Sequence, residues 1–312
     1  MPFKRSPQKF NAAIKTVEIG TGDKKIVIGG ENVLPFYTFD EPIENAPKVG
    51  VEILDTGLEG LSAGLVEFYG TDDVVEIAKK AAAVEGADFI TLRFDGADPN
   101  GLDKSVEECA ELAKSVAEAV DLPIVIAGCK NNDKDIALFS AVSEKLEGKN
   151  ILVLSAKEET YKTVGASAGL AYGQKVGAES AVDINLAKQL NVVTTQLGVK
   201  ADGIIMDIGT AAAGYGYEYV VSTMDRIKAA ALSQDDAMLQ MPIITPVASE
   251  TWNVKESMAS EEDMPEWGNR EERGISMEIM TAAANLVSGS NAVILRHPQS
   301  VATIAKMVKE LV

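Results

Sequence analysis

The stretch VGVEILD, residues 49–55, is the first of about eight short β-branched and apolar runs that recur to the end of the chain. Each run is followed by a longer segment in which apolar residues recur with helical spacing, and no linker-like gap interrupts the alternation. This rhythm is typical of parallel strands that are each followed by a helix. The expected strands cover residues 49–53, 88–92, 124–127, 151–154, 181–184, 204–207, 242–245 and 292–295.

The number of these units favours a closed barrel. An open doubly wound sheet gives a similar pattern with fewer units, whereas about eight near-equal units in roughly 260 residues suit an α/β fold of the (β/α)8 TIM barrel type. Three expected outer helices, residues 72–84, 103–120 and 133–146, each begin with an aspartate. We expect these carboxylates to cap the free N–H groups of the first helical turn.

The residues ahead of the barrel predict an N-terminal β-hairpin extension. Residues 16–30 contain two alternating runs, VEIG and IVIGG, joined by the turn-like TGDKK. Residues 31–48 contain three prolines and predict an extended crossing into the first barrel strand. The chain is therefore expected to divide into a hairpin and crossing, residues 1–48, and a TIM barrel, residues 49–312.

Composition and charge narrow the possible partners. Apolar residues make up 46% of the chain and charged residues 24%, which fits a globular protein with a sizeable core. The formal charge, 29 − 47 = −18, opposes binding to a phosphate backbone, so no nucleic acid is expected. No run of eighteen apolar residues occurs, and no signal-like apolar stretch follows the basic start of the chain. We therefore expect no membrane span and a cytoplasmic location.

Metal-binding side chains are scarce. Cys109 and Cys129 are the only cysteines, so an iron–sulfur cluster held by four thiolates cannot be built from this chain alone. His297 is the only histidine, which removes most histidine-based metal sites and acid–base schemes. The sequence therefore predicts no metal site.

Loops that follow the strands of a parallel barrel build its functional site, so residues just past the expected strands are the candidates. The set is rich in amide and hydroxyl groups and comprises Arg93, Asp95, Cys129, Asn131, Asn132, Ser155, Asp207, Thr210, Thr245 and His297. Asp207 is the best-placed carboxylate, either for proton chemistry or for orienting the loop that follows it.

Two of these loops have a distinctive composition. MDIGTAAAGYGYEY, residues 206–219, is either a flexible turn ahead of a helix or a flat, backbone-lined surface for a broad planar ligand or a partner protein. In GCKNND, residues 128–133, we favour a buried structural thiol for Cys129 over a nucleophile with a lowered pKa. Asn131 and Asn132 in the same loop offer hydrogen bonds to a heterocycle or to amides.

An acidic segment, residues 247–269, interrupts the rhythm between the seventh strand and its helix and holds both tryptophans. It is either a long surface loop anchored by Trp252 and Trp267, or a lid or docking segment on the functional rim.

Three stretches together resemble one protein family over essentially the whole chain. They are KIVIGGENVLPFYTFDEP (residues 25–42), VGVEILD (residues 49–55) and DIGTAAAGYGYEY (residues 207–219). This sequence resembles the small subunit of the corrinoid iron–sulfur protein, a family that includes the delta subunit of acetyl-CoA decarbonylase/synthase complexes. The context of His297, RHPQS, is not the D-x-H-x-x-G pattern by which many cobalamin proteins supply an axial histidine.

The resemblance implies a TIM barrel paired in a heterodimer with a large subunit that holds a four-iron cluster and a cobalamin domain. The corrinoid would lie between that domain and the barrel rim. It would carry a methyl group from methyltetrahydrofolate, through a separate methyltransferase, to acetyl-CoA synthase in the reductive acetyl-CoA (Wood–Ljungdahl) pathway. This chain would then be a methyl-carrier subunit that is not catalytic alone. The residues expected to contact the cofactor are Asn131, Asn132, Ser155, Asp207, Gly209, Thr210, Ala211, Gly214 and Tyr215.

Two other functions are compatible with the same barrel. An autonomous methyltransferase would bind a pterin ring through Asp207 and the rim asparagines, although no clear acid to protonate the pterin nitrogen stands out in the sequence. A purely structural scaffold would use its rim to contact protein alone.

Overall fold

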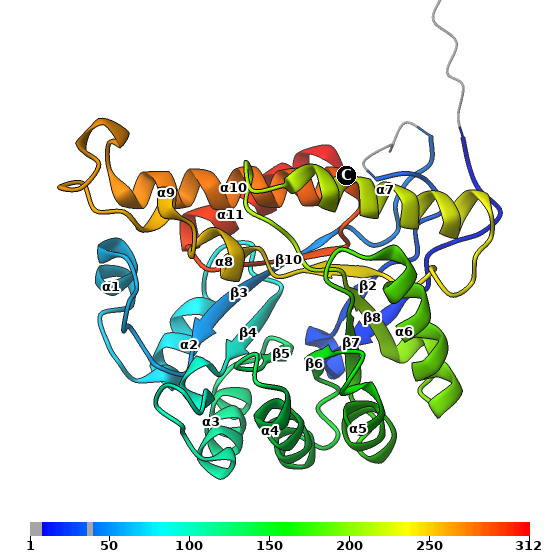
Figure 1. Cartoon of the computed structure of the whole chain (residues 1–312), viewed down its shortest axis with the longest axis horizontal. Coiled ribbons are helices and arrows are strands. Elements are labelled where there is room, and N and C mark those ends of the chain that lie inside the picture. The colour runs from blue at the N-terminus through cyan, green and yellow to red at the C-terminus, as the bar shows by residue number, and fades with distance from the viewer. Residues whose placement is uncertain (1–7, 36–39) are drawn as a thin grey trace, which may run out of the picture.

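The barrel strands run through the middle of the molecule (Figure 1). The computed structural model describes residues 8–35 and 40–312. Eight parallel strands form a closed barrel in the order β10-β3-β4-β5-β6-β7-β8-β9, which confirms the expected TIM barrel. The strands are β3 Lys48–Leu54, β4 Phe89–Arg93, β5 Ile124–Ala127, β6 Leu152–Ala156, β7 Lys175–Glu179, β8 Ile204–Asp207, β9 Ile243–Thr245 and β10 Ala292–Leu295.

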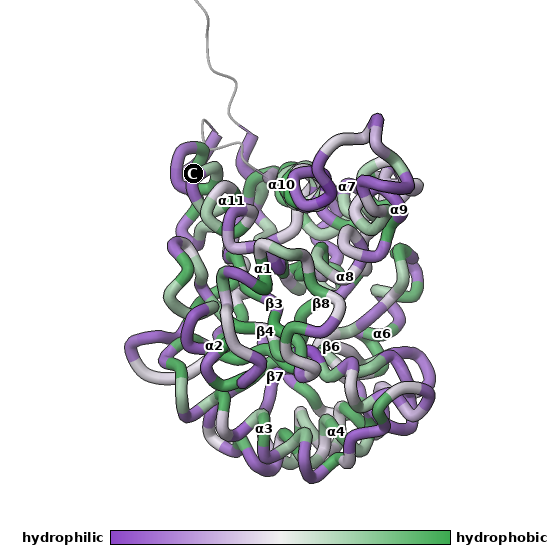
Figure 2. The backbone as a smooth tube through the Cα atoms, turned by 90° about the vertical axis from the view of Figure 1, so that its left-hand side faces the viewer, coloured by the Kyte–Doolittle hydropathy of each residue, from purple (hydrophilic) through white to green (hydrophobic). Residues whose placement is uncertain are grey.

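Helices follow the strands and surround the largely hydrophobic barrel (Figure 2). The α-helices are α1 Ala63–Tyr69, α2 Val74–Ala82, α3 Val106–Ala119, α4 Asn132–Lys145, α5 Tyr161–Val164, α6 Ile184–Leu197, α7 Tyr217–Ser233, α8 Val247–Thr251, α9 Lys255–Met258, α10 Arg270–Ser288 and α11 Pro298–Leu311. The 3-10 turns are η1 Gly22–Lys24, η2 Asp95–Ala97, η4 Ala201–Gly203 and η5 Pro265–Trp267, and η3 Gly165–Ala171 is a π-helix. Within the described ranges, no helix is long and apolar enough to cross a membrane.

Side chains along each strand alternate between the barrel interior and the helix layer. In β8, Ile205 belongs to the interior cluster, whereas Ile204 and Met206 pack among the helices. Phe89 of β4 also faces inward and occupies the space beside Gly50 of β3, where a Cβ atom would lie 2.1 Å from the Phe89 ring. Gly50 is therefore needed for packing inside the barrel.

The N-terminal hairpin closes one end of this interior. Strands β1 Val17–Ile19 and β2 Ile26–Ile28 pair antiparallel, as the sequence predicts. Their apolar side chains join the interior cluster of the barrel. The amide nitrogen of Asn150, just before β6, donates to the carbonyls of Glu18 (2.9 Å) and Gly20 (3.0 Å). The hairpin therefore plugs the N-terminal end of the barrel.

The expected fifth strand at residues 181–184 is wrong. The strand is β7, Lys175–Glu179, and Ala181 and Val182 adopt left-handed φ angles of 46° and 64° that no strand accommodates. β7 was hard to recognise because glycine, lysine and glutamate are all poor strand formers. Gly177 is required there, because a Cβ atom would lie 2.3 Å from the Leu154 side chain.

The expected capping aspartates are also wrong, although the three helices exist. Helix α2 is capped by Asp73, α3 by Ser105 in a capping box with Glu108, and α4 by Asn131. In each case a side chain one to two residues from the expected aspartate accepts the free N–H groups. Part of the expected crossing at residues 31–48, namely residues 36–39, lies outside the described residues.

The acidic segment between β9 and α10 folds into α8, α9 and η5. Trp252 is buried against Gly274 of α10, where a Cβ atom would lie 2.3 Å from the indole ring. Trp267 is partly exposed, with the Lys255 ammonium 5.3 Å and the Arg273 guanidinium 5.6 Å from its ring. Trp252 thus anchors the segment, while a lid or docking role stays a prediction.

Candidate functional site

A layer of charged side chains lies at the C-terminal end of the barrel interior. In three strands, an inward-facing glycine or isoleucine is followed, two residues nearer the C-terminal end, by an inward-facing acidic residue. The pairs are Gly50 and Glu52 in β3, Gly177 and Glu179 in β7, and Ile205 and Asp207 in β8. Because side chains alternate with a period of two, these late positions point into the barrel mouth. The strand pattern therefore places the charges together.

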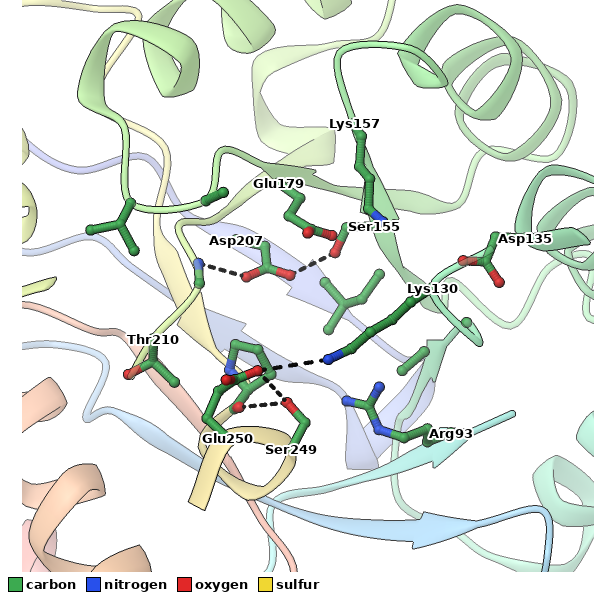
Figure 3. Close-up of a pocket in the computed structure, with 17 residues that line it drawn as sticks. Arg93, Lys130, Asp135, Ser155, Lys157, Glu179, Asp207, Thr210, Ser249 and Glu250 are labelled. Atoms are coloured by element: carbon green, nitrogen blue, oxygen red, sulfur yellow. Dashed lines mark hydrogen bonds and ion pairs between the residues drawn. The ribbon is translucent and has the colours of Figure 1, made fainter. Parts of the chain in front are cut away.

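Glu179 and Asp207 line a pocket of about 270 Å³, and Glu52 lies outside its lining. Figure 3 shows side chains converging on it from the ends of several strands and from helix α8, which follows β9. Its charged residues are Arg93, Lys130, Asp135, Lys157, Glu179, Asp207 and Glu250, and its hydroxyl groups are those of Ser155, Thr210 and Ser249. Small and apolar residues complete the wall, namely Ala127, Gly128, Leu154, Ala181, Val182, Gly209 and Pro246.

Asp207 is buried and held by two donors. The hydroxyl of Ser155 donates to one carboxylate oxygen at 2.6 Å, and the backbone N–H of Gly209 donates to the other at 3.0 Å. Burial raises the pKa of Asp207, while these two hydrogen bonds oppose the rise. The carboxyl therefore orients both the end of β6 and the loop that begins at Gly209, as the sequence suggested.

Glu179 behaves differently from its neighbour. Burial, followed by the nearby Asp207 carboxylate, raises the pKa of Glu179 from 4.5 to about 7. Its side chain points toward Ser155 and Asp207 (Figure 3) and makes no hydrogen bond to any residue that the structure describes. Glu179 therefore offers the pocket a carboxyl that can hold or release a proton near neutral pH.

Arg93 is held in place by a buried ion group. Its Nε donates to one oxygen of Glu52 at 2.7 Å, and Arg296 approaches the other oxygen, also at 2.7 Å. Burial favours the neutral acid, but the two arginines outweigh it and lower the pKa of Glu52 to about 2. Glu52 is thus an anion that positions both guanidinium groups beneath the rim.

Four more charged side chains lie around the mouth of the pocket. The Lys130 ammonium lies 3.7 Å from Glu250 across the opening (Figure 3). Asp135 accepts the backbone N–H of Cys129 at 2.7 Å, which fixes the loop after β5. Among the described residues, the Lys157 ammonium bonds only to the side-chain oxygen of Asn132, at 3.5 Å, and Lys157 lines the pocket.

The expected cofactor contacts fall into two groups. Ser155, Asp207, Gly209 and Thr210 line the pocket. The other five lie outside its lining: Asn131, Asn132, Ala211, Gly214 and Tyr215. Their part in binding a ligand stays a prediction.

Several of these residues have structural partners that the sequence did not reveal. Thr210 accepts a hydrogen bond from the Asn285 amide at 2.9 Å, and Asn131 caps α4 by accepting the N–H of Lys134. The hydroxyl of Tyr215 donates to Glu256 at 2.5 Å, which ties the glycine-rich loop to α9.

Two other candidates have roles in the fold. Burial raises the pKa of Cys129 to about 11, which disfavours a thiolate nucleophile and fits the structural thiol. The Nδ1 atom of His297 accepts the N–H of Gln299 at 3.1 Å and caps α11, and its Nε2 atom lies 3.1 Å from Glu271. Within the described ranges, no three His, Cys, Asp or Glu side chains gather in a way that could hold a metal ion.

The pocket residues that sequence reasoning missed include Glu179, Lys157, Asp135, Ser249 and Glu250. Glu179 was hidden because the fifth strand was placed six residues too late, which removed it from the strand end. The pattern KVGAE, in which Gly177 and Glu179 are two residues apart, is the signal that could have revealed it.

Comparison with known proteins assigns the family. The family model described as CO dehydrogenase/acetyl-CoA synthase delta subunit matches residues 16–298. The chain belongs to this family. Acetyl-CoA decarbonylase/synthase complex subunit delta 1 of Methanosarcina thermophila is 35% identical over 300 residues, which cover 94% of this chain and 67% of the relative. Subunit delta of Methanocaldococcus jannaschii is 34% identical over 313 residues, covering 97% of this chain and 75% of the relative.

Solved structures share the fold of this delta-subunit family member. The 7,8-dihydropteroate synthase of Vibrio fischeri superimposes with a TM-score of 0.59 at 11% identity and covers 94% of this chain and 97% of its own. Dihydropteroate synthase of Xanthomonas albilineans gives a TM-score of 0.56 at 12% identity, covering 85% of this chain and 93% of its own. At these identities the likeness concerns the barrel fold alone.

Proposed function

We propose that this chain is the delta subunit of an acetyl-CoA decarbonylase/synthase type of complex and covers and orients a corrinoid at the rim of its barrel. The observation that carries the proposal is the family match, which spans both the barrel and the glycine-rich rim loop. The relatives are named as subunits of a complex, and this supports a partner for this chain as well. The expected partner is a large subunit that holds a four-iron cluster and a cobalamin domain.

The size of the pocket is compatible with a corrinoid only if the ring stays outside. At about 270 Å³ the pocket is at the lower end of the range for small-molecule sites and cannot enclose a macrocycle. It can accept a group from the edge of the ring. The polar lining matches such edge groups, because corrinoids carry amides around the ring.

The chain's own contribution is to position the cofactor and keep water from it. When bound, the corrinoid would supply the cobalt that carries a methyl group between a separate methyltetrahydrofolate-dependent methyltransferase and acetyl-CoA synthase. The loop that starts at Gly209 offers open backbone: apart from Gly214 itself and its two chain neighbours, no described residue has an atom within 4 Å of a Cβ atom built on Gly214. This loop and the asparagines after β5 form the surface on which we place the ring.

A bulky side chain at the pocket mouth tests this placement. Ala181 is exposed and lines the pocket, so Ala181→Trp fills the mouth, whereas Ala229→Trp adds the same bulk on the exposed face of α7. We expect the chain co-purified with its large subunit, without oxygen, to show altered or missing corrinoid absorption bands in Ala181→Trp and unchanged bands in Ala229→Trp. If a 1:1 complex forms and its corrinoid spectrum is the same in both variants, the corrinoid does not lie at this rim, and the chain acts only as a structural scaffold.

One observation favours a second candidate, the autonomous pterin-binding methyltransferase. Glu179, with a pKa of about 7, is a candidate acid to protonate the pterin nitrogen, and the sequence alone did not reveal it. If the isolated chain transfers a methyl group from methyltetrahydrofolate to free cobalamin reduced to the cob(I)alamin state, and Glu179→Gln stops the transfer, the enzyme replaces the carrier subunit. We expect no transfer by the isolated chain.

A further inference from the structure

Three groups in the pocket have hydrogen-bonding capacity that the fold does not use. The Glu179 carboxyl makes no hydrogen bond to the described part of the chain, and Lys157 has only its long contact with Asn132. The Nε of Arg93 donates to Glu52, and its two terminal nitrogens make no hydrogen bond to residues 8–35 and 40–312. The guanidinium is turned into the pocket (Figure 3). Donors and a carboxyl therefore face one space from three different strand ends.

The charges around this space are balanced. The lining contains three cations, Arg93, Lys130 and Lys157, and four acids, of which Glu179 has a pKa raised to about 7 and is protonated in part of the molecules at neutral pH. When Glu179 is protonated, the three positive charges face the carboxylates of Asp135, Asp207 and Glu250. A charged ligand would lose its hydration and gain no net attraction, so the pocket favours a neutral, polar group.

The free groups also define the hydrogen-bond pattern of that neutral ligand. A protonated carboxyl donates one hydrogen bond through its hydroxyl and accepts another at its carbonyl oxygen. Arg93 and Lys157 add donors only, while Asp207 adds an acceptor. The matching ligand has a carbonyl acceptor next to an N–H donor, which is an amide or a lactam.

We propose that the pocket between Glu179, Lys157 and Arg93 is a binding site for a neutral amide group, and that it receives a side-chain carboxamide of the corrinoid. The choice of the corrin as the source of the amide rests on the proposed function. The amide site itself rests on the pocket. The same chemistry could come from the lactam edge of a free pterin, and the two sources give different results in the test.

The apolar residues of the pocket fit this assignment. Ala181 and Gly209 leave room for a flat group, and Leu154, Val182 and Pro246 exclude water around it. Val182 keeps a φ of 64° although it is β-branched, and its backbone is fixed by the N–H of Val182 donating to Ile208 at 2.7 Å. Residues with a strained backbone φ angle that neighbouring hydrogen bonds hold in place are often found at ligand-binding sites.

The test compares two changes at Glu179 with a matched change elsewhere. Glu179→Leu removes the hydrogen-bonding groups, Glu179→Gln keeps a donor and an acceptor without a charge, and Glu85→Leu alters an exposed glutamate before β4. The full chain, with and without its large subunit, is titrated by calorimetry with hydroxocobalamin and separately with pterin. We expect Glu179→Leu to weaken cobalamin binding about tenfold, which is the loss of one to two buried hydrogen bonds, and the other two variants to stay within about twofold.

The results separate this inference from the proposed function. If Ala181→Trp blocks cobalamin but Glu179→Leu binds it as tightly as the unchanged chain, the corrinoid role stands and the amide site falls. If only pterin binds, and Glu179→Leu weakens it, the amide site stands and the corrinoid role falls. If neither ligand depends on Glu179, or if Glu179→Gln is as weak as Glu179→Leu, the amide site is overturned.

Discussion

Ionised Glu179 lowers the free energy of unfolding near neutral pH, and substitution of its carboxyl group removes this effect. Its pKa is raised to about 7 by burial and by Asp207, with Asp135 adding to the rise and Lys157 and Lys130 opposing it. A carboxyl with a raised pKa does not affect stability below its ordinary value of 4.5. It destabilises the fold progressively as the pH rises from 4.5 to about 7, because the folded chain then resists losing the proton.

Glu179→Gln is therefore expected to stabilise the chain at pH 8 by about 2 kcal/mol and to change little at pH 4.5. Urea unfolding at the two pH values measures the difference. The neutral amide keeps the shape of the side chain but has no proton to lose. An equal gain at both pH values would show that the effect is one of packing and that the pKa of Glu179 is ordinary.

Glu52 has the opposite character. Its pKa is lowered to about 2, so it stabilises the fold above pH 4.5 and this contribution is lost as the pH falls toward 2. Glu52→Gln leaves Arg93 and Arg296 buried without their carboxylate, and we expect a loss of about 3–5 kcal/mol in the free energy of unfolding. The control, Glu59→Gln, changes an exposed residue in the loop after β3 and is expected to stay within about 0.5 kcal/mol. Similar losses in both variants would contradict the buried ion group.

At the scale of elements, the hairpin β1–β2 acts as part of the core although it precedes the barrel. Ile28 is 1% exposed and packs in the barrel interior, whereas Val27 on the same strand is partly exposed. Ile28→Ala is expected to cost about 2–5 kcal/mol, and Val27→Ala about 1 kcal/mol or less. Guanidinium unfolding of the two variants checks this, and equal costs would mean that the hairpin is a loose extension.

The same elements show what the sequence predicts well. Seven of the eight strands lie within one or two residues of their expected positions, because runs such as VGVEIL and the ILVLSA stretch are long, apolar and bounded by turns. Strand β7 was missed because its inward-facing residues are glycine and charged residues, which strand propensities do not favour. The glycine is required because Gly177 packs against Leu154, and strand propensity does not reveal such a contact. The helix caps were displaced by one or two residues for a similar reason, since several polar residues near each helix start can accept the same N–H groups.

The candidate site was predictable only in part. Asp207, Ser155, Gly209 and Thr210 follow directly from the rule that strand ends build the site of a parallel barrel. The ion group of Glu52, Arg93 and Arg296 joins residues that are far apart in the sequence. Such a contact depends on barrel closure and register, which a single sequence does not specify residue by residue.

On the scale of the whole molecule, the two ends of the barrel have separate tasks. The N-terminal end is closed by apolar side chains of the hairpin, and the C-terminal end is an open, polar pocket. Between them lies the packed interior, with Phe89, Leu152 and Ile205 among its members. Strand β3, the longest of the barrel, is roughly 20 Å long, because its seven residues rise about 3.3 Å each.

This separation predicts that changes at the two ends act independently on stability. Effects of substitutions more than about 10 Å apart, without shared partners, add to within about 0.5 kcal/mol. We therefore expect the Ile28→Ala/Glu179→Gln double variant at pH 8 to unfold with the sum of the two single changes, so that the stabilised pocket partly offsets the weakened hairpin. Urea unfolding of the four chains of this cycle gives the coupling directly. A coupling free energy above about 1 kcal/mol between the two substitutions would contradict this independence and show that the interior transmits strain from the hairpin to the pocket. Substitutions in the hairpin would then be expected to alter ligand binding at the rim as well.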